Sequence, residues 1–121
     1  MDDVDRVFRQ VHRVLKPEHP LVFSVPHPFY DLLDDDADEP LLVRRSYFDR
    51  SPLEVQRDGE AFVQYRHTVG DLFTSLSRAN FRVDTILEPE PRSSGRRSRD
   101  WRDTFAMVPR TLVVRARKQG I

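Results

Sequence analysis

The sequence predicts an α/β fold from three features of the chain. Residues 4–15 carry apolar side chains at helical spacing, and a continuous apolar run at 21–25 follows after a short turn. A second helix-then-strand pair spans 68–87, and a third apolar run follows at 111–117. Helices that alternate with short apolar strands are typical of α/β proteins, so we expect one domain of this class.

The first helix is predicted from an apolar stripe and from its two ends. The residues of the stripe are Val4, Val7, Phe8, Val11, Val14 and Leu15. Asp2, Asp3 and Asp5 lie at the helix N-terminus, where the helix dipole favours negative charge, and Pro17 ends the helix. Because the stripe lies on one side only, this helix must pack against another element.

The run Leu21–Val25 does not alternate apolar and polar side chains, and Pro26-His27-Pro28 ends it. A short run of this kind is typical of a parallel strand that is buried on both faces. Helix, tight turn and buried strand together form half of an α/β unit, which supports the predicted fold class.

The middle of the chain predicts a loop and then a hairpin. Residues 31–39 contain six acids, so we expect a solvated and mobile loop. Extended segments are expected near Leu41–Phe48 and Ala61–His67, and Asp58-Gly59 between them is a hairpin signal. The apolar side chains available for packing in this hairpin are Val55, Phe62, Val63 and Tyr65.

The second helix has signals at both ends. Thr68 is its expected N-cap with Asp71 in a capping box, and Asn80 can adopt the left-handed conformation at its end. Its apolar face consists of Val69, Leu72, Phe73, Leu76 and Ala79. Strands are expected at 82–87 and 111–117, separated by an arginine-rich loop at 92–102.

The composition excludes several classes of function. The 121 residues include no cysteine, which excludes disulfides and thiolate chemistry, and no apolar stretch is long enough to cross a membrane. The N-terminus is acidic and does not resemble a signal peptide, so we expect a cytoplasmic protein. The four glycines are isolated, so there is no glycine-rich loop to hold a nucleotide. The four histidines lack metal-ligand spacing, and we expect no metal site.

The charges are divided unevenly along a chain of zero net charge. Residues 1–60 contain 14 acids and 8 bases, whereas residues 61–121 contain 6 acids and 12 bases. Eighteen of the 20 bases are arginine, which indicates GC-rich coding, and the asymmetry could alternatively reflect attraction between the two halves in the fold. Trp101 and the arginines around it could form a lid or a nucleic-acid patch, or a solvated loop with one anchoring aromatic. Neutral overall charge argues against nucleic-acid binding.

Four stretches, taken in order, resemble the C-terminal half of class I S-adenosylmethionine-dependent methyltransferases that act on small molecules. Val7–Pro17 is similar to the helix and turn before the fifth strand of that family, and Leu21–Pro28 to the fifth strand itself. Tyr65–Thr68, with the helix that ends at Asn80-Phe81, resembles the last helix of the family, and Leu112–Lys118 its terminal strand. The resemblance covers nearly the whole chain.

This resemblance implies the C-terminal portion of a Rossmann-like sheet. Its elements would be a helix, a buried parallel strand, an antiparallel hairpin excursion, a helix, a strand, and a final antiparallel strand between its two predecessors. Residues 1–121 would then form a single partial domain that lacks the N-terminal cofactor-binding half. S-adenosylmethionine is the cofactor of the complete family, and we expect this chain alone to bind none. Glu18-His19 and Asn80 replace glycines of the family, and Arg66-His67 reverses its order.

The resemblance also suggests substrate-binding residues, namely His27, Phe29, Tyr30, Tyr65, Arg66 and His67. The first of these lies at the strand end where α/β sheets bind ligands, and histidine titrates near neutral pH. It is therefore the candidate for acceptor contact or for a general base, or it only shapes the turn. The two aromatic residues after it could wall an acceptor pocket or cap the core. The last three could contact the acceptor or form a polar strand end.

Two functions follow from these observations. The chain would supply the acceptor-side half of a methyltransferase that acts on a small molecule, and would be inactive alone. Alternatively, it is a non-catalytic interaction protein, since its first helix and strand would expose apolar surface. Such a protein would form a homo-oligomer, or pair with a partner chain that supplies the missing strands, along its exposed sheet edge.

Overall fold

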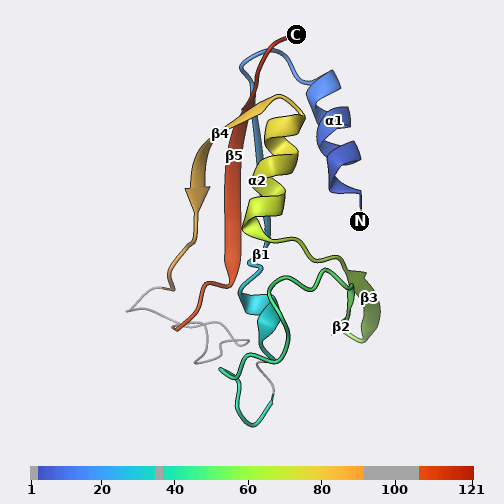
Figure 1. The fold of residues 1–121 in the computed structure, drawn as a ribbon, viewed down its shortest axis with the longest axis vertical. Coiled ribbons are helices and arrows are strands. Elements are labelled where there is room, and N and C mark those ends of the chain that lie inside the picture. Colours follow the sequence, from blue (N-terminus) through green and yellow to red (C-terminus); the bar gives the residue numbers. More distant parts are fainter. Residues whose placement is uncertain (1–2, 35–36, 92–106) are drawn as a thin grey trace.

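The computed structural model describes residues 3–34, 37–91 and 107–121 (Figure 1). Its elements are α1 (Val4–Val14), β1 (Pro20–Pro26), a 3₁₀ helix (Tyr30–Leu32), β2 (Leu53–Arg57), β3 (Glu60–Gln64), α2 (Val69–Arg78), β4 (Phe81–Leu87) and β5 (Thr111–Lys118). The element order confirms the predicted α/β class. The arginine-rich loop at 92–102, with Trp101, lies outside the described residues.

The main sheet has the strand order β1–β5–β4, with β5 antiparallel to both neighbours. Val22 pairs with Arg115 on one side of β5, and Val83 pairs with Ala116 on the other. An irregularity after Val83 leaves Asp84 as an extra residue in β4. The expected insertion of an antiparallel strand between two parallel predecessors is therefore confirmed.

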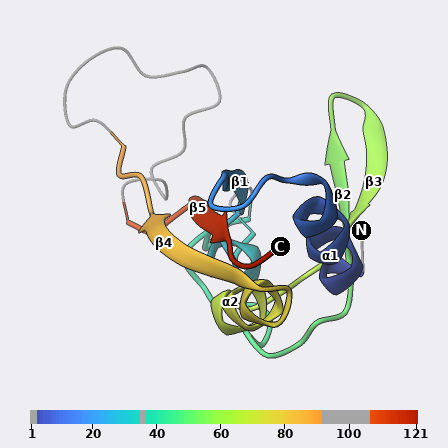
Figure 2. The same ribbon diagram turned by 90° about the horizontal axis from the view of Figure 1, so that it is seen from above.

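The two α-helices, α1 and α2, lie on the same side of this sheet (Figure 2). The buried core between them and the sheet consists of Phe8, Leu72, Leu76, Ala79, Phe81, Leu112, Val114 and Ala116. Phe8 of α1 contacts Phe23 of β1 with 5.5 Å between ring centroids. The core is thus a single apolar layer formed by one face of the sheet and the two helices.

The opposite face of the sheet is open in the described part of the chain. Leu21, Phe23 and Val25 pack toward the core, but Val22 between them is 58% exposed. The expectation that this strand is buried on both faces is therefore wrong for the described residues, because both helices cover the same face. Apolar composition marked the strand correctly but did not determine how many of its faces are covered.

Both helices begin as expected. Asp3 caps α1 by accepting a hydrogen bond from the backbone N–H of Arg6, and Thr68 and Asp71 form the predicted capping box of α2. Asn80 adopts the left-handed conformation with φ of 62°, as predicted. Two stripe residues face solvent instead of the core, since Val14 is 74% exposed and Phe73 is 51% exposed. None of the helices described is long and apolar enough to span a membrane.

The predicted hairpin is present, but its first arm is β2 rather than the segment near Leu41–Phe48. Asp58 and Gly59 both have positive φ and form a two-residue turn, which pairs the residues directly beside it. The pairing therefore begins at Arg57 and Glu60. It ends before His67, and Phe62 and Val63, expected to pack, are 41% and 49% exposed.

The acidic segment at 31–39 begins as folded structure. Asp31 lies in the 3₁₀ helix and is only partly exposed, and Leu32 and Leu33 are buried. The expectation of a solvated loop is thus wrong at this end of the segment, because two leucines anchor it. Asp35 and Asp36 lie outside the described residues.

Candidate functional site

A cleft of about 880 Å³ lies between the C-terminal end of β1, the 3₁₀ helix and the hairpin. Ser24, Val25 and Pro26 line it from β1, and Thr111 lines it from the start of β5. Ligands of α/β proteins bind at the carboxyl ends of the parallel strands, and β1 ends at this cleft. The cleft is therefore the candidate functional site of the described chain.

Asp31 lines the cleft from the 3₁₀ helix and is tied to the hairpin. The side-chain amide of Gln64, at the end of β3, donates a 2.7 Å hydrogen bond to its Oδ1. Burial raises the pKa of Asp31, and the hydrogen bond from Gln64 and the charges of Arg66 and Arg45 oppose this rise only in part. The carboxylate is therefore held in a partly desolvated, electropositive place.

Arg45 fixes the backbone on which Asp31 is placed. Its guanidinium donates to the carbonyl oxygens of Asp31 at 2.6 Å and of Leu33 at 3.3 Å. It also pairs with the carboxylate of Asp34 at 2.8 Å. A single arginine thus satisfies carbonyl groups at the end of the 3₁₀ helix, where no further helical turn can do so.

Arg66 is the most buried arginine near the cleft, with 6% of its surface exposed. Its Nη2 donates to the carbonyl oxygen of Ser46 at 3.0 Å, whereas its buried Nε has no hydrogen-bond partner in the part of the chain described. Burial of an arginine is costly unless it is paired, and the described partners satisfy this one incompletely. Its charge is one of those that act on Asp31.

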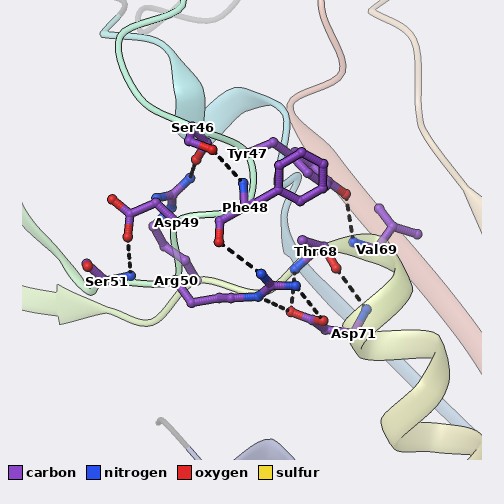
Figure 3. Close-up of polar contacts among 10 residues, drawn as sticks. Ser46, Tyr47, Phe48, Asp49, Arg50, Ser51, Thr68, Val69 and Asp71 are labelled. Atoms are coloured by element: carbon purple, nitrogen blue, oxygen red, sulfur yellow. Dashed lines mark hydrogen bonds and ion pairs between the residues drawn. The ribbon is translucent and has the colours of Figure 1, made fainter.

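The segment 46–51, which supplies that carbonyl, is anchored on the start of α2 (Figure 3). The Tyr47 hydroxyl accepts a hydrogen bond from the backbone N–H of Val69 at 2.9 Å. Arg50 donates to both carboxylate oxygens of Asp71 at 2.9 Å. This bidentate pair lowers the pKa of Asp71 to about 2, mainly through the hydrogen bond from Arg50. The helix terminus thereby holds the segment whose Ser46 carbonyl accepts the hydrogen bond from Arg66.

His27 lies directly after β1, as predicted, and is 5% exposed. Its Nδ1 accepts a hydrogen bond from the backbone N–H of Phe29 at 3.0 Å, so in this neutral form the proton is on Nε2. Nε2 then donates to the carboxylate of Glu88, with 2.5 Å between the two atoms. Glu88 is the residue directly after β4. Both ring nitrogens are engaged, and the ring links the ends of two strands.

The other predicted site residues have different surroundings. Tyr30 lines the cleft, and Phe29 is 38% exposed. Tyr65 and His67 are half-buried on either side of Arg66. Around Asp31 the structure brings together Tyr30, which adjoins it in the cleft lining, Arg66, whose charge acts on it, and His27. Of these, only Tyr30 is among the residues that line the cleft.

Asp31, Arg45 and Gln64 are not among the site residues predicted from the sequence. Asp31 was assigned to the acidic loop because the charge run dominated the pattern. Leu32-Leu33 directly after it was the available signal, because two large apolar residues in an acidic segment indicate that its start is packed. Gln64 and Arg45 carried no such signal, since their roles depend on how the hairpin folds back.

The described glycines, Gly59, Gly70 and Gly120, are isolated in the sequence and form no glycine-rich turn. Among the described residues, no group of three or more histidines and acids could hold a metal ion.

Comparison with solved structures identifies the fold. A protein from Listeria monocytogenes described as an S-adenosylmethionine-dependent methyltransferase matches 96% of this chain, with a TM-score of 0.73 and 26% identity. An S-adenosylmethionine-dependent methyltransferase from Mesorhizobium loti matches 98% of the chain, with a TM-score of 0.69 and 26% identity. No protein-family model and no curated protein matches the sequence.

The chain spans little more than half the length of these structures, 55% and 57% respectively. The resemblance predicted from the sequence is confirmed at the level of the fold, and the coverage is consistent with a C-terminal half.

Proposed function

We propose, from the premise that this chain has the fold of about half of an S-adenosylmethionine-dependent methyltransferase, that it is the acceptor-side half of such an enzyme. The acceptor would be a small molecule, and the cleft at the end of β1 would hold it. The chain alone would be inactive. The antiparallel insertion of β5 between β1 and β4 is the observation that carries the proposal.

Three features of the chain support this proposal. The cleft lies at the carboxyl end of β1, and it contains both polar and apolar side chains, as sites for small molecules commonly do. Gly59, Gly70 and Gly120 are isolated, and the proposal assigns the donor site to residues outside this chain. When bound to a complete enzyme, S-adenosylmethionine supplies the methyl group. The residues that line the cleft would position the acceptor. In a direct displacement, positioning of the reactants makes the larger contribution to catalysis.

Calorimetry with S-adenosylhomocysteine tests the first part of the proposal. We expect no heat of binding with the chain as given, and binding would contradict the assignment of the donor site to other residues. The DNA before the Met1 codon tests the second part. An in-frame segment that encodes a strand, a glycine-rich turn and a helix should restore binding when it is expressed with this chain. An extended chain that folds and binds no donor would contradict the proposal.

A non-catalytic interaction protein is the second candidate function. The outer edge of β1 pairs with no strand in the described part of the chain, and Val22 on its open face is exposed. Such an edge is a template for pairing with another chain. Light scattering at increasing concentration tests this candidate. A dimer that dissociates when Val22 becomes Lys supports it, and a monomer at all concentrations contradicts self-pairing.

A further inference from the structure

Asp31 and Glu54 line the cleft without an ion-pair partner among the described residues, and Asp31 is the one that a neighbouring side chain orients by a hydrogen bond. Asp34, its neighbour in the lining, is paired with Arg45, whereas Asp31 receives only one side-chain hydrogen bond, from Gln64 to Oδ1. The second carboxylate oxygen has no hydrogen-bond partner in the described part of the chain. Gln64 thus fixes the orientation of the carboxyl group and leaves one oxygen available to a ligand.

The positive charges of Arg45 and Arg66 act on this carboxylate, and His27 lies near it. Arg45 holds the backbone of the segment that contains Asp31, Arg66 lies before α2, and His27 lies after β1. The two guanidiniums keep their charge at any ordinary pH, and the neutral tautomer of His27 is the one that accepts from Phe29. A ligand group beside Asp31 therefore lies in the field of Arg66, which does not itself line the cleft, and of Arg45, whose charge is shared with Asp34.

This combination discriminates between possible ligand groups. A cationic amine would gain from Asp31 but would be repelled by the two guanidiniums. A neutral hydroxyl can donate to the carboxylate, and negative charge that develops on its oxygen would be stabilised by the guanidiniums. An ether of the same size has no proton to donate and would leave the acid unsatisfied. The site is therefore complementary to a hydroxyl group that is losing its proton.

We propose that the cleft binds a neutral hydroxyl compound and that Asp31 accepts the hydrogen bond and then the proton of that hydroxyl. In this step the O–H bond breaks, the proton passes to the free carboxylate oxygen of Asp31, and the electron pair stays on the ligand oxygen. The inference rests on the proposed function and deepens it, because it names the chemical class of the acceptor as an alcohol or phenol. The raised pKa of Asp31 agrees with a group that can hold such a proton.

The experiment uses the chain as it exists and three probes that share one ring: benzyl alcohol, benzyl methyl ether and benzylamine. Binding is followed by NMR through the side-chain amide signal of Gln64, which contacts Asp31. We expect the alcohol to bind at least about tenfold more tightly than the ether, since one hydrogen bond to a charged group contributes about 1.4 kcal/mol or more. The amine should bind no more tightly than the alcohol.

The variant Asp31→Asn tests the role of the carboxylate. The new amide group would direct an N–H toward the cleft, so the preference for alcohol over ether should be lost. Because the substitution removes a partly buried charge, we also expect a higher melting temperature at neutral pH. The matched control is Asp58→Asn in the hairpin turn, whose positive φ suits asparagine, and it should keep the preference.

Three outcomes would overturn the inference: equal binding of alcohol and ether to the native chain, no binding of any probe at millimolar concentration, or an unchanged preference in Asp31→Asn. The assay contains no methyl donor, so these outcomes leave the methyltransferase proposal intact. Conversely, an extended chain that fails to bind S-adenosylhomocysteine would overturn that proposal and leave the hydroxyl preference of the cleft measurable.

Discussion

The two faces of the sheet differ sharply although they are built from the same three strands. On the covered face, β5 places Leu112, Val114 and Ala116 against the helices with at most 3% of their surface exposed. On the open face, the same strand places Arg115 and Arg117 beside Asp84 of β4, at 2.7 and 2.8 Å. One face is held by apolar burial, and the other presents paired charges to solvent.

Alternate side chains of a single strand therefore differ in how much they contribute to the stability of the fold. Burial of a large apolar side chain contributes about 1.5–3 kcal/mol, whereas an exposed ion pair contributes about 0–1 kcal/mol. The stability of the described chain should therefore come almost entirely from the covered face. The open face can change with little effect on folding, and its exposed charges and Val22 remain available for contact with another surface.

The largest effect is expected from Leu76→Ala on the covered face. Leu76 is 1% exposed at the centre of the core, so the substitution leaves a cavity and should lower the free energy of unfolding by about 2–5 kcal/mol. Urea denaturation measures this loss. A loss of less than about 1 kcal/mol would show that the helices do not pack on the sheet as described.

The next effect concerns Lys118, a charged residue that alternation places on the covered face. It is 5% exposed, and its Nζ donates to the carbonyl oxygen of Leu15 at 2.7 Å, just after the end of α1. Lys118→Met keeps the apolar stem and leaves the carbonyl unsatisfied, so we expect a loss of about 1–3 kcal/mol in the same assay. The exposed Lys16→Met should change little, and equal losses would contradict the capping role.

A smaller effect that depends on pH is expected on the open face. The hydrogen bond from Arg115 is the main cause that lowers the pKa of Asp84 to about 2, from an ordinary value of 3.8. A lowered pKa means that this carboxylate stabilises the fold above about pH 4, and that the contribution is lost as pH falls through about 2. In Asp84→Asn the free energy of unfolding should therefore fall less as the pH is lowered. Identical acid unfolding curves for the native chain and Asp84→Asn would contradict this prediction.

The smallest effect is expected from Val22→Ser, and the variant for comparison is Phe23→Ala at the next position. Val22 is 58% exposed on the open face, so its loss should change the free energy of unfolding by no more than about 0.5 kcal/mol. Phe23 contacts Phe8 across the core, and its truncation should be far more costly. If the two variants were equally destabilised, the open face would have to be covered in solution.

Local signals predicted most of the fold, and tertiary arrangement determined the remainder. Thr68, Asp71 and Asn80 identified both ends of α2 because caps depend only on nearby backbone. The burial of β1 on one face was not predictable, since an apolar strand does not reveal which face its helices cover. His27 was placed correctly at the strand end, but its bond to Glu88 depends on a residue 61 positions away.

The position of β5 between β1 and β4 also has a kinetic consequence. The two outer strands do not touch each other, so neither can pair in the main sheet until β5 arrives. The contact between Leu15 and Lys118, for example, joins positions 103 residues apart in sequence. Long loops must therefore close before the sheet gains any pairing energy, which slows folding. During that interval the apolar residues of β1 are accessible to other chains, and this period, more than the finished fold, is when the protein is most exposed to aggregation.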